Sequence, residues 1–168
     1  MTEELRESEM IYLLKKINIS LEICLEKRLK GSGMSGTQVY FLVYILRHHP
    51  KGTYITEMCR ETGLSKATLS VLVKKMREKG YLCFVEEPED IRKKKVIPTE
   101  KLLNEGAEFM QKTQQMEDEI CSALDSAERL ELWELEHKIL TRLGREQRQE
   151  TDKTDNKCEE KDRQEVTA

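Results

Sequence analysis

The sequence contains no long hydrophobic run, and this absence excludes a membrane-spanning protein. The longest apolar stretch is VYFLVYIL at 39–46, whereas a helix that crosses a bilayer needs about 20 apolar residues. The first ten residues, MTEELRESEM, also lack the basic region and apolar core of a signal peptide. We therefore expect a cytoplasmic protein with no membrane partner.

Cysteine and histidine are too few and too scattered to form a recognisable metal centre. No C-x-x-C motif and no zinc-type histidine spacing is present, so we expect reduced cysteines, no metal and no cofactor. The five cysteines are Cys24, Cys59, Cys83, Cys121 and Cys158. No catalytic triad, phosphate loop or pair of catalytic carboxylates stands out, and the sequence therefore gives an enzyme little support.

Proline and glycine are also scarce, with three and eight residues among 168. Together with 38% hydrophobic and 36% charged residues, this composition is typical of a helix-rich globular chain. The length fits one compact domain, or one domain with a tail. The residues beyond Gly144 are almost wholly polar, and we expect a disordered tail from residue 149.

Charge is distributed unevenly along the chain, although the formal net charge is only −3. Residues 51–101 carry twelve Lys and Arg against eight Asp and Glu, whereas residues 102–144 carry four against ten. A basic segment inside an acidic chain indicates a polyanionic partner for that segment.

Hydrophobic spacing predicts helices on both sides of the basic segment. Met10, Leu14, Ile17 and Leu21 recur at helical intervals, and Thr37 is suited to cap a second, nearly apolar helix through QVYFLVYILRHH. Further helices are expected from Thr99 onwards and over 126–143, where Asp125 and Glu128 have the spacing of a capping box.

The basic segment itself predicts a helix-turn-helix followed by a hairpin. TEMCRET forms a short helix that ends at Gly63, and Ser65 caps the next helix. In that helix Leu69, Leu72, Val73 and Met76 share one face. YLCFV and KKKVIP then form two strands joined by EEPEDIR. A mainly α protein with a small β-hairpin wing is the predicted fold, and it is typical of winged helix-turn-helix proteins.

The stretch YITEMCRETGLSKATLSVLVKKMREKGYL, with EEPEDIRKKKVIPTEK after it, closely resembles the helix-turn-helix and wing of MarR-type transcription regulators. The resemblance covers residues about 35 to 104 and implies a homodimer on a pseudo-palindromic double-stranded DNA operator. It also implies four segments: a dimerisation helix and linker at 1–36, the DNA-binding domain at 37–101, dimerisation helices at 102–148, and the tail at 149–168. A ligand- or stress-responsive repressor is the implied function, with a small-molecule effector as a further partner.

The resemblance also assigns roles to individual residues. Ser65 and Thr68 are implied to contact phosphate, Arg92 to enter the minor groove, and Asp90 to pair with Arg92 and aim it. Base edges are assigned to Lys66, Ala67, Ser70 and Val71, and positions near the DNA backbone to Lys74 and Lys75. Lys93 and Lys94 are further expected DNA-binding residues. Related proteins often carry Arg in place of Val71 and Gly in place of Leu102. An apolar side chain at 71 suits contact with a thymine methyl group.

Two questions stay open at the level of sequence. An effector pocket is expected to include Tyr12, Tyr40, Tyr44 and Arg47, although their spacing does not place them together. A winged helix whose basic face binds protein, or whose dimer serves as a scaffold, is the alternative function. DNA binding should weaken steeply with added salt, which a mainly apolar protein contact should not do.

Overall fold

The computed structural model describes residues 6–144 of the chain. It comprises two compact units, Met1–Glu119 and Ile120–Ala168. The expected tail from residue 149 lies outside the described residues, and the four segment boundaries stay predictions. Within 6–144, no helix is both long and apolar enough to cross a membrane.

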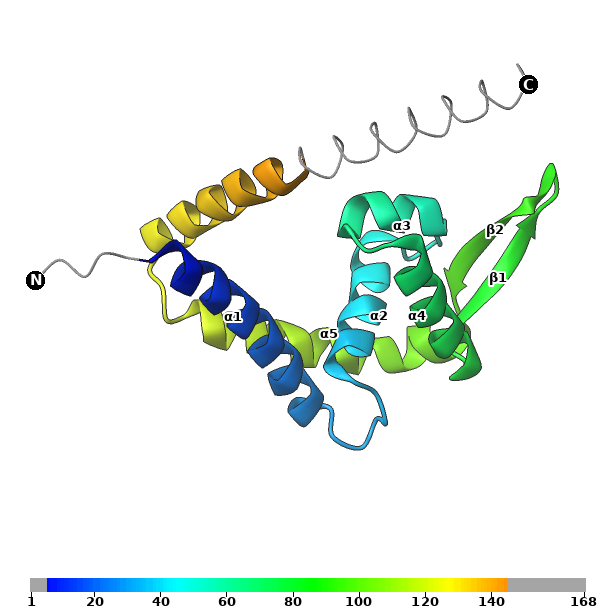
Figure 1. Ribbon diagram of the computed structural model, residues 1–168. Coiled ribbons are helices and arrows are strands. Elements are labelled where there is room, and N and C mark those ends of the chain that lie inside the picture. The colour runs from blue at the N-terminus through cyan, green and yellow to red at the C-terminus, as the bar shows by residue number, and fades with distance from the viewer. Residues whose placement is uncertain (1–5, 145–168) are drawn as a thin grey trace, which may run out of the picture. The chain divides into compact units, whose positions relative to one another are not determined.

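The first unit holds the helices and the hairpin in the order predicted from the sequence (Figure 1). These elements are α1 (Glu7–Arg28), α2 (Gly36–His48), α3 (Ile55–Thr62), α4 (Lys66–Glu78), β1 (Leu82–Glu87), β2 (Asp90–Pro98) and α5 (Glu100–Cys121). β1 and β2 pair antiparallel, and Thr53 adds an isolated bridge to Val96. The predicted fold, mainly α with a hairpin wing, is confirmed.

The core of this unit is centred on α2, as its apolar sequence predicts. Val39, Leu42 and Ile45 are fully buried on α2. Leu25 of α1, Leu69 and Met76 of α4, Val96 of β2 and Leu102 of α5 belong to the same buried cluster. Arg28 of α1 forms an ion pair with Glu119, and Arg47 of α2 forms one with Glu117, so α5 is tied to both helices.

Two glycines mark the places where helices approach most closely. A Cβ atom on Gly36 would lie 2.0 Å from the backbone oxygen of Glu22, which means that α1 and α2 touch backbone to backbone. A Cβ on Gly106 would lie 2.5 Å from Cδ1 of Leu46, at the contact of α5 with α2. Close packing therefore explains why Gly106 lies inside a helix, where glycine ordinarily lowers helix stability by about 1 kcal/mol relative to alanine.

The start of α2 differs from the prediction. Ser35 is the N-cap, not Thr37: its hydroxyl accepts a hydrogen bond from the N–H of Gln38, and the Gln38 side chain accepts one from the N–H of Ser35. This capping box satisfies two helix-end donors at once, which a cap at Thr37 would leave without side-chain acceptors.

In the second unit, residues 126–144 are helical. The predicted capping box at its start is confirmed, because Asp125 accepts from the N–H of Glu128 at 2.9 Å and Glu128 accepts from the N–H of Asp125 at 2.8 Å. Large apolar side chains on this helix are exposed in the single chain, among them Leu130, Trp133 and Leu140.

Candidate nucleic-acid interface

The turn between α3 and α4 has the geometry that the sequence predicts. Gly63 ends α3 in the left-handed region at φ 73°, a conformation that glycine adopts without strain. Ser65 caps α4 by accepting a hydrogen bond from the N–H of Thr68 at 3.1 Å, and the two hydroxyls are 2.8 Å apart. The exposed start of α4 thus presents two hydroxyl groups and free helix N–H groups, which suit an anion.

The two faces of α4 separate as predicted. Leu69, Leu72, Val73 and Met76 are buried, and they hold the helix against the core. All the residues assigned to base edges or backbone contacts on this helix are exposed: Lys66, Ala67, Ser70, Val71, Lys74 and Lys75. α4 can therefore enter a groove without disturbing its packing.

The tip of the hairpin is irregular. Glu86 faces Lys94 across the ladder, while the next residue, Glu87, faces Asp90. Ile91, Arg92 and Lys93 therefore have no partner in the β1 register, and all three are exposed. Such bulges commonly redirect side chains near functional surfaces.

The Asp90 carboxylate makes a contact with the backbone of the hairpin tip. Its carboxylate accepts a hydrogen bond from the backbone N–H of Arg92 at 3.0 Å. No ion pair joins Asp90 to the Arg92 guanidinium in the part of the chain that the structure describes. Asp90 therefore holds the backbone of the tip, and its implied pairing with the Arg92 side chain stays a prediction.

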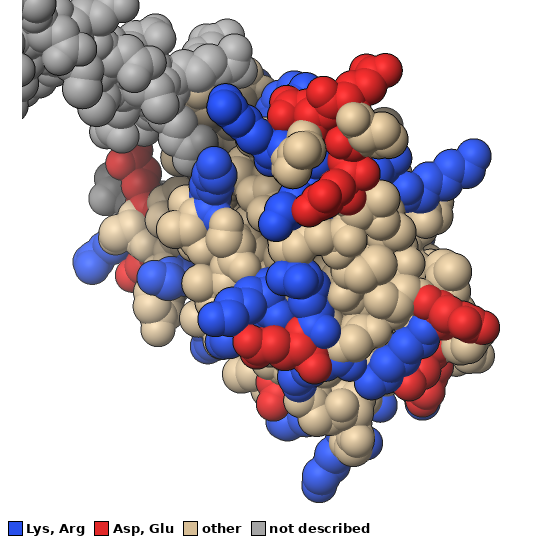
Figure 2. All heavy atoms as spheres, turned by 90° about the vertical axis from the view of Figure 1, so that its right-hand side faces the viewer, with Lys and Arg blue, Asp and Glu red and all other residues tan. Residues whose placement is uncertain are grey.

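The structure brings one predicted residue of α4 and three of the hairpin together on one cleft of about 280 Å³. Four cationic side chains line it, Lys66 from α4 and Arg92, Lys93 and Lys94 from β2, beside Tyr54, Ile55, Thr56 and Phe84. Figure 2 shows this side of the molecule, where Lys and Arg are spread over the surface with Asp and Glu between them. A concave, cation-lined surface of this kind suits a phosphate backbone.

Sequence reasoning missed the residues that hold the hairpin in place. The Tyr54 hydroxyl, at the start of α3, donates a hydrogen bond to Glu87 at the end of β1. This bond raises the pKa of Tyr54. The Arg77 guanidinium of α4 lies 4.2 Å from the centre of the Phe84 ring, a cation–π contact with β1. Both contacts join residues far apart in sequence, and no local pattern signals them.

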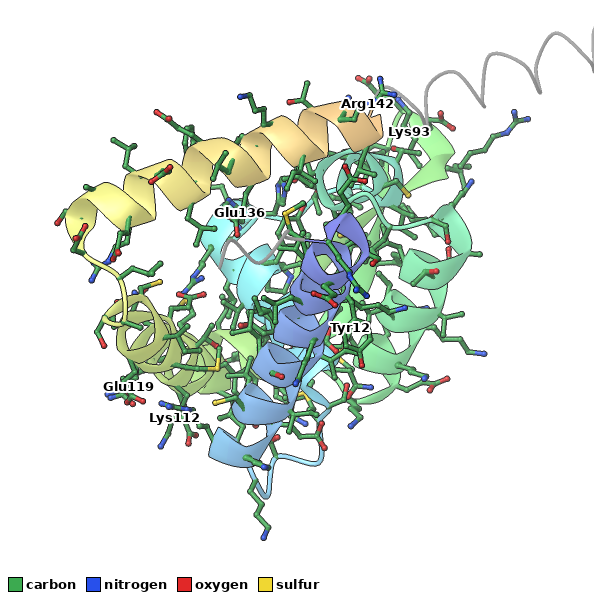
Figure 3. The ribbon with its side chains drawn as sticks, turned by 60° about the vertical axis from the view of Figure 1, so that its left-hand side comes forward. Tyr12, Lys93, Lys112, Glu119, Glu136 and Arg142 are labelled. Atoms are coloured by element: carbon green, nitrogen blue, oxygen red, sulfur yellow. The ribbon has the colours of Figure 1, made fainter. Side chains whose placement is uncertain are left out.

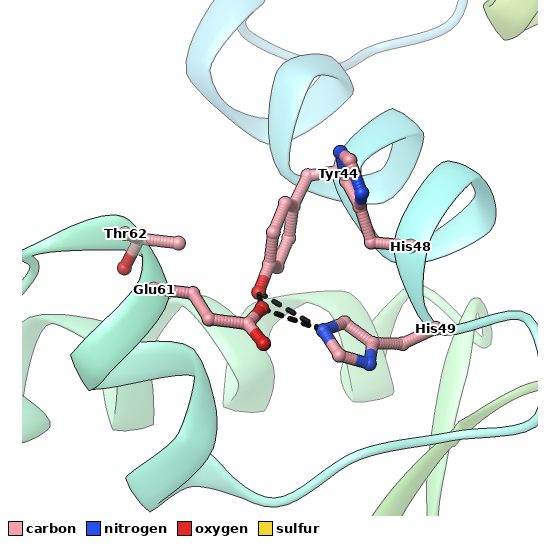
Figure 4. Close-up of a pocket in the computed structure, with 5 residues that line it drawn as sticks. All are labelled: Tyr44, His48, His49, Glu61 and Thr62. Carbon is pink, nitrogen blue, oxygen red and sulfur yellow. Dashed lines mark hydrogen bonds and ion pairs between the residues drawn. The ribbon is translucent and has the colours of Figure 1, made fainter. Parts of the chain in front are cut away.

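The predicted effector residues lie on two helices, Tyr12 on α1 and Tyr40, Tyr44 and Arg47 on α2. Tyr12 lies on α1 and is 70% exposed (Figure 3). Arg47 donates two hydrogen bonds to the carboxylate of Glu117, both at 2.9 Å. Tyr40 is half-buried, and this burial raises the pKa of its hydroxyl. Tyr44 instead lines an open hollow with His48, His49, Glu61 and Thr62 (Figure 4). Their assignment to an effector stays a prediction.

A short helix, a glycine turn, an exposed basic helix and a basic hairpin together define a winged helix-turn-helix protein. Residues 32–93 match the model of the MarR family, so this segment is similar to that family. The resemblance recognised in the sequence is confirmed. No curated protein matches the chain.

Solved structures share the fold at low sequence identity. The MepR–DNA complex of S. aureus is 19% identical with a TM-score of 0.74, covering 80% of this chain and 97% of that one. A structure of a putative MarR-family regulator from Listeria monocytogenes in complex with a 26mer DNA is 16% identical with a TM-score of 0.69. The match covers 78% of this chain and 86% of that one. BpsR of Bordetella bronchiseptica, whose DNA binding is regulated by 6-hydroxynicotinic acid, is 18% identical with a TM-score of 0.66. The match covers 78% of this chain and 98% of that one.

Proposed function

We propose that this protein is a sequence-specific, DNA-binding transcriptional regulator that acts as a homodimer on a pseudo-palindromic operator. The convergence of Lys66 with Arg92, Lys93 and Lys94 on one cleft carries the proposal. Lys and Arg that neutralise phosphates release bound counterions, which supplies much of the affinity for DNA. The position of this cleft between α4 and the hairpin suits contact with the backbone between two neighbouring grooves.

The exposed face of α4 is the proposed reader of the major groove. Lys66, Ala67, Ser70 and Val71 face the bases in this proposal, with Ser65 and Thr68 on phosphate and Lys74 and Lys75 near the backbone. Val71 is 54% exposed although it is apolar. A thymine methyl group opposite Val71 would cover that surface, so we expect an A·T pair there.

The hairpin is the proposed reader of the minor groove. Arg92 enters the groove from the bulged tip, and Lys93 and Lys94 contact the flanking phosphates. Asp90 holds the tip backbone through the N–H of Arg92. Narrow minor grooves attract arginine because their negative potential is enhanced.

A salt titration of operator and competitor DNA tests both readers. Arg92→Ala should weaken binding to both duplexes and reduce the salt slope by about one unit, since one cation is lost. Lys66→Ala or Ser70→Ala should cost about 1–3 kcal/mol mainly on the operator. Binding to duplexes that does not depend on salt, or variants that bind both duplexes as tightly as wild type, would contradict the proposal. Either result would favour a protein-interaction module.

Regulation by a small molecule or by stress is the finer part of the proposal. The similarity to BpsR, a protein regulated by 6-hydroxynicotinic acid, supports it. In the proposed mechanism a ligand alters the separation of the two recognition helices in the dimer, which must match about one turn of DNA. Repression then ends because operator affinity falls. Titration of candidate ligands against a preformed DNA complex tests this, and release of DNA is the expected result.

A further inference from the structure

Three polar side chains form a closed triangle of hydrogen bonds where α2 ends beside α3 (Figure 4). The Tyr44 hydroxyl donates to Oε2 of Glu61. Nε2 of His49 lies 2.7 Å from the same oxygen and 3.2 Å from the Tyr44 hydroxyl. Tyr44 and His49 belong to the last turn and C-cap of α2, whereas Glu61 belongs to the last turn of α3.

The triangle holds α3 next to the turn that leads into the recognition helix. Glu61 precedes Thr62, whose hydroxyl donates to the carbonyl of Met58 and accepts from the N–H of Leu64. Leu64 is followed by Ser65, the cap of α4. Residues 62–65 thus connect Glu61 directly to the start of α4, so a shift of Glu61 is expected to displace that end of the helix.

The protonation state of the triangle follows from its geometry. Hydrogen bonds from Tyr44 and His49 lower the pKa of Glu61, so its side chain is a carboxylate that only accepts. His49 must therefore donate from Nε2. Both hydrogen bonds to Glu61 end on a charged acceptor and are charge-assisted.

The surroundings of His49 supply few competing charges. On α2 the facing groups are Tyr44 and His48, whose ring lies 5.4 Å from that of Tyr44. On α3 they are Glu61, Glu57 and Arg60, and Glu57 and Arg60 form a weak contact of 3.9 Å with each other. The His49 side chain is 14% exposed, whereas that of Glu61 is 36% exposed. His49 is thus the histidine that contacts α3 directly, and it is more enclosed than Glu61.

We propose that Glu61 is a positioning residue for DNA binding, fixed by its hydrogen bonds to Tyr44 and His49. The inference rests on the proposed function. Loss of these hydrogen bonds frees the end of α3 and, with it, the turn that leads into α4, and operator affinity falls.

The first experiment measures binding of the full chain to a labelled duplex that the wild-type protein has selected from a random-sequence pool. Glu61→Gln keeps the size of the side chain and one acceptor oxygen but removes the charge. We expect several-fold weaker binding, because the hydrogen bonds that hold α3 beside the end of α2 lose their charge assistance. Glu108→Gln on α5 is the matched control, because it removes the same charge from an exposed site and should bind like wild type.

The second experiment measures the same affinity for His49→Gln, which retains an N–H donor, and for His49→Ala, which has none. His49→Gln should bind like wild type, and His49→Ala should bind as weakly as Glu61→Gln. Binding of His49→Ala as tight as that of wild type, or Glu61→Gln binding as tightly as Glu108→Gln, would overturn the inference. If Glu61→Gln does not fold, the two His49 variants decide. A wild-type protein that binds no duplex would instead contradict the proposed function.

Discussion

At the scale of single residues, the missing side chains of Gly36 and Gly106 decide how closely the helices pack. Both glycines stand at helix contacts, but what faces them differs. The backbone of Glu22 lies against Gly36, and the flexible end of Leu46 lies against Gly106. A main chain cannot move aside locally, whereas the end of a leucine side chain can rotate.

Gly36→Ala should therefore lower the free energy of unfolding by more than about 2 kcal/mol, because α1 and α2 must separate to admit the methyl group. Gly106→Ala should be close to neutral, since displacement of the Leu46 side chain is offset by a gain of about 1 kcal/mol in helix propensity. Urea denaturation of both variants checks the contrast. Equal destabilisation would mean that the two contacts are equally rigid.

Asp90 offers a second test at this scale, because the acceptor role and the charge of its carboxylate can be separated. Asp90→Asn keeps an oxygen for the N–H of Arg92 and removes a negative charge near DNA, so affinity should rise by about two- to threefold. Asp90→Ala also removes the hydrogen bond, which is worth about 0.5–1.5 kcal/mol, and should bind more weakly than Asp90→Asn. DNA titrations at two salt concentrations check this order, and the reverse order would contradict the assigned hydrogen bond.

At the residue scale, local features could be predicted from the sequence, whereas contacts between segments far apart in the chain could not. Leu69 and Met76 were predicted to be buried from helical spacing alone, and both are fully buried. The helix cap Ser65 could be predicted because its signal is local. The contacts of His49 with Tyr44 and Glu61 could not, since they depend on how α2 meets α3.

At the scale of elements, backbone and side-chain hydrogen bonds help to attach the hairpin to the rest of the unit. Tyr54 to Glu87 is one of them, and the Thr53–Val96 bridge is another. Tyr54→Phe removes only the hydroxyl, so amide hydrogen exchange in β1 and in the tip should become several-fold faster. Tyr81→Phe is the matched control, because its hydroxyl bonds Glu105 on α5. If both variants leave hairpin exchange unchanged, Tyr54 does not anchor the wing.

The order of helices and strands was predictable because each signal is periodic or is a turn residue. The hairpin was read from its β-branched and aromatic residues, although both strands extend further into EEPEDIR than predicted. The start of α2 was misplaced because Thr37 directly precedes the apolar run. The correct signal was present as Ser35 and Gln38, spaced as in a capping box. The bulge at 91–93 carries no such local signal.

At the scale of the whole molecule, α1 exposes more apolar surface than a monomer would leave uncovered. Only Leu25 is fully covered on α1. The exposed apolar residues of this helix are Met10, Ile11, Tyr12, Leu13, Ile17, Ile19 and Ile23. Large exposed apolar patches mark interaction sites, and the expected occupant is a second copy of this chain.

Ile17→Glu should therefore raise the dissociation constant of the dimer by at least about 100-fold, because a charge would be buried in the contact. Val85→Glu introduces the same charge at an equally exposed apolar site on the hairpin, 45% against 47%, and should leave the dimer intact. Sedimentation equilibrium measures both. A wild-type monomer at micromolar concentration would rule out this assembly.

The recognition helix is secured at both ends, whereas the tip of the wing is not. Ser65 caps its start, and at its end Lys79 donates to the carbonyl of Gly33 while the Lys79 carbonyl accepts from Lys101. Ile91, Arg92 and Lys93 have no cross-strand partners. This difference predicts an order of events during binding. We expect α4 to dock first without rearrangement, and the wing to bind the neighbouring groove afterwards. Dissociation then begins with the wing, so substitutions there act mainly on the lifetime of the complex, and those on α4 mainly on which sequences are retained.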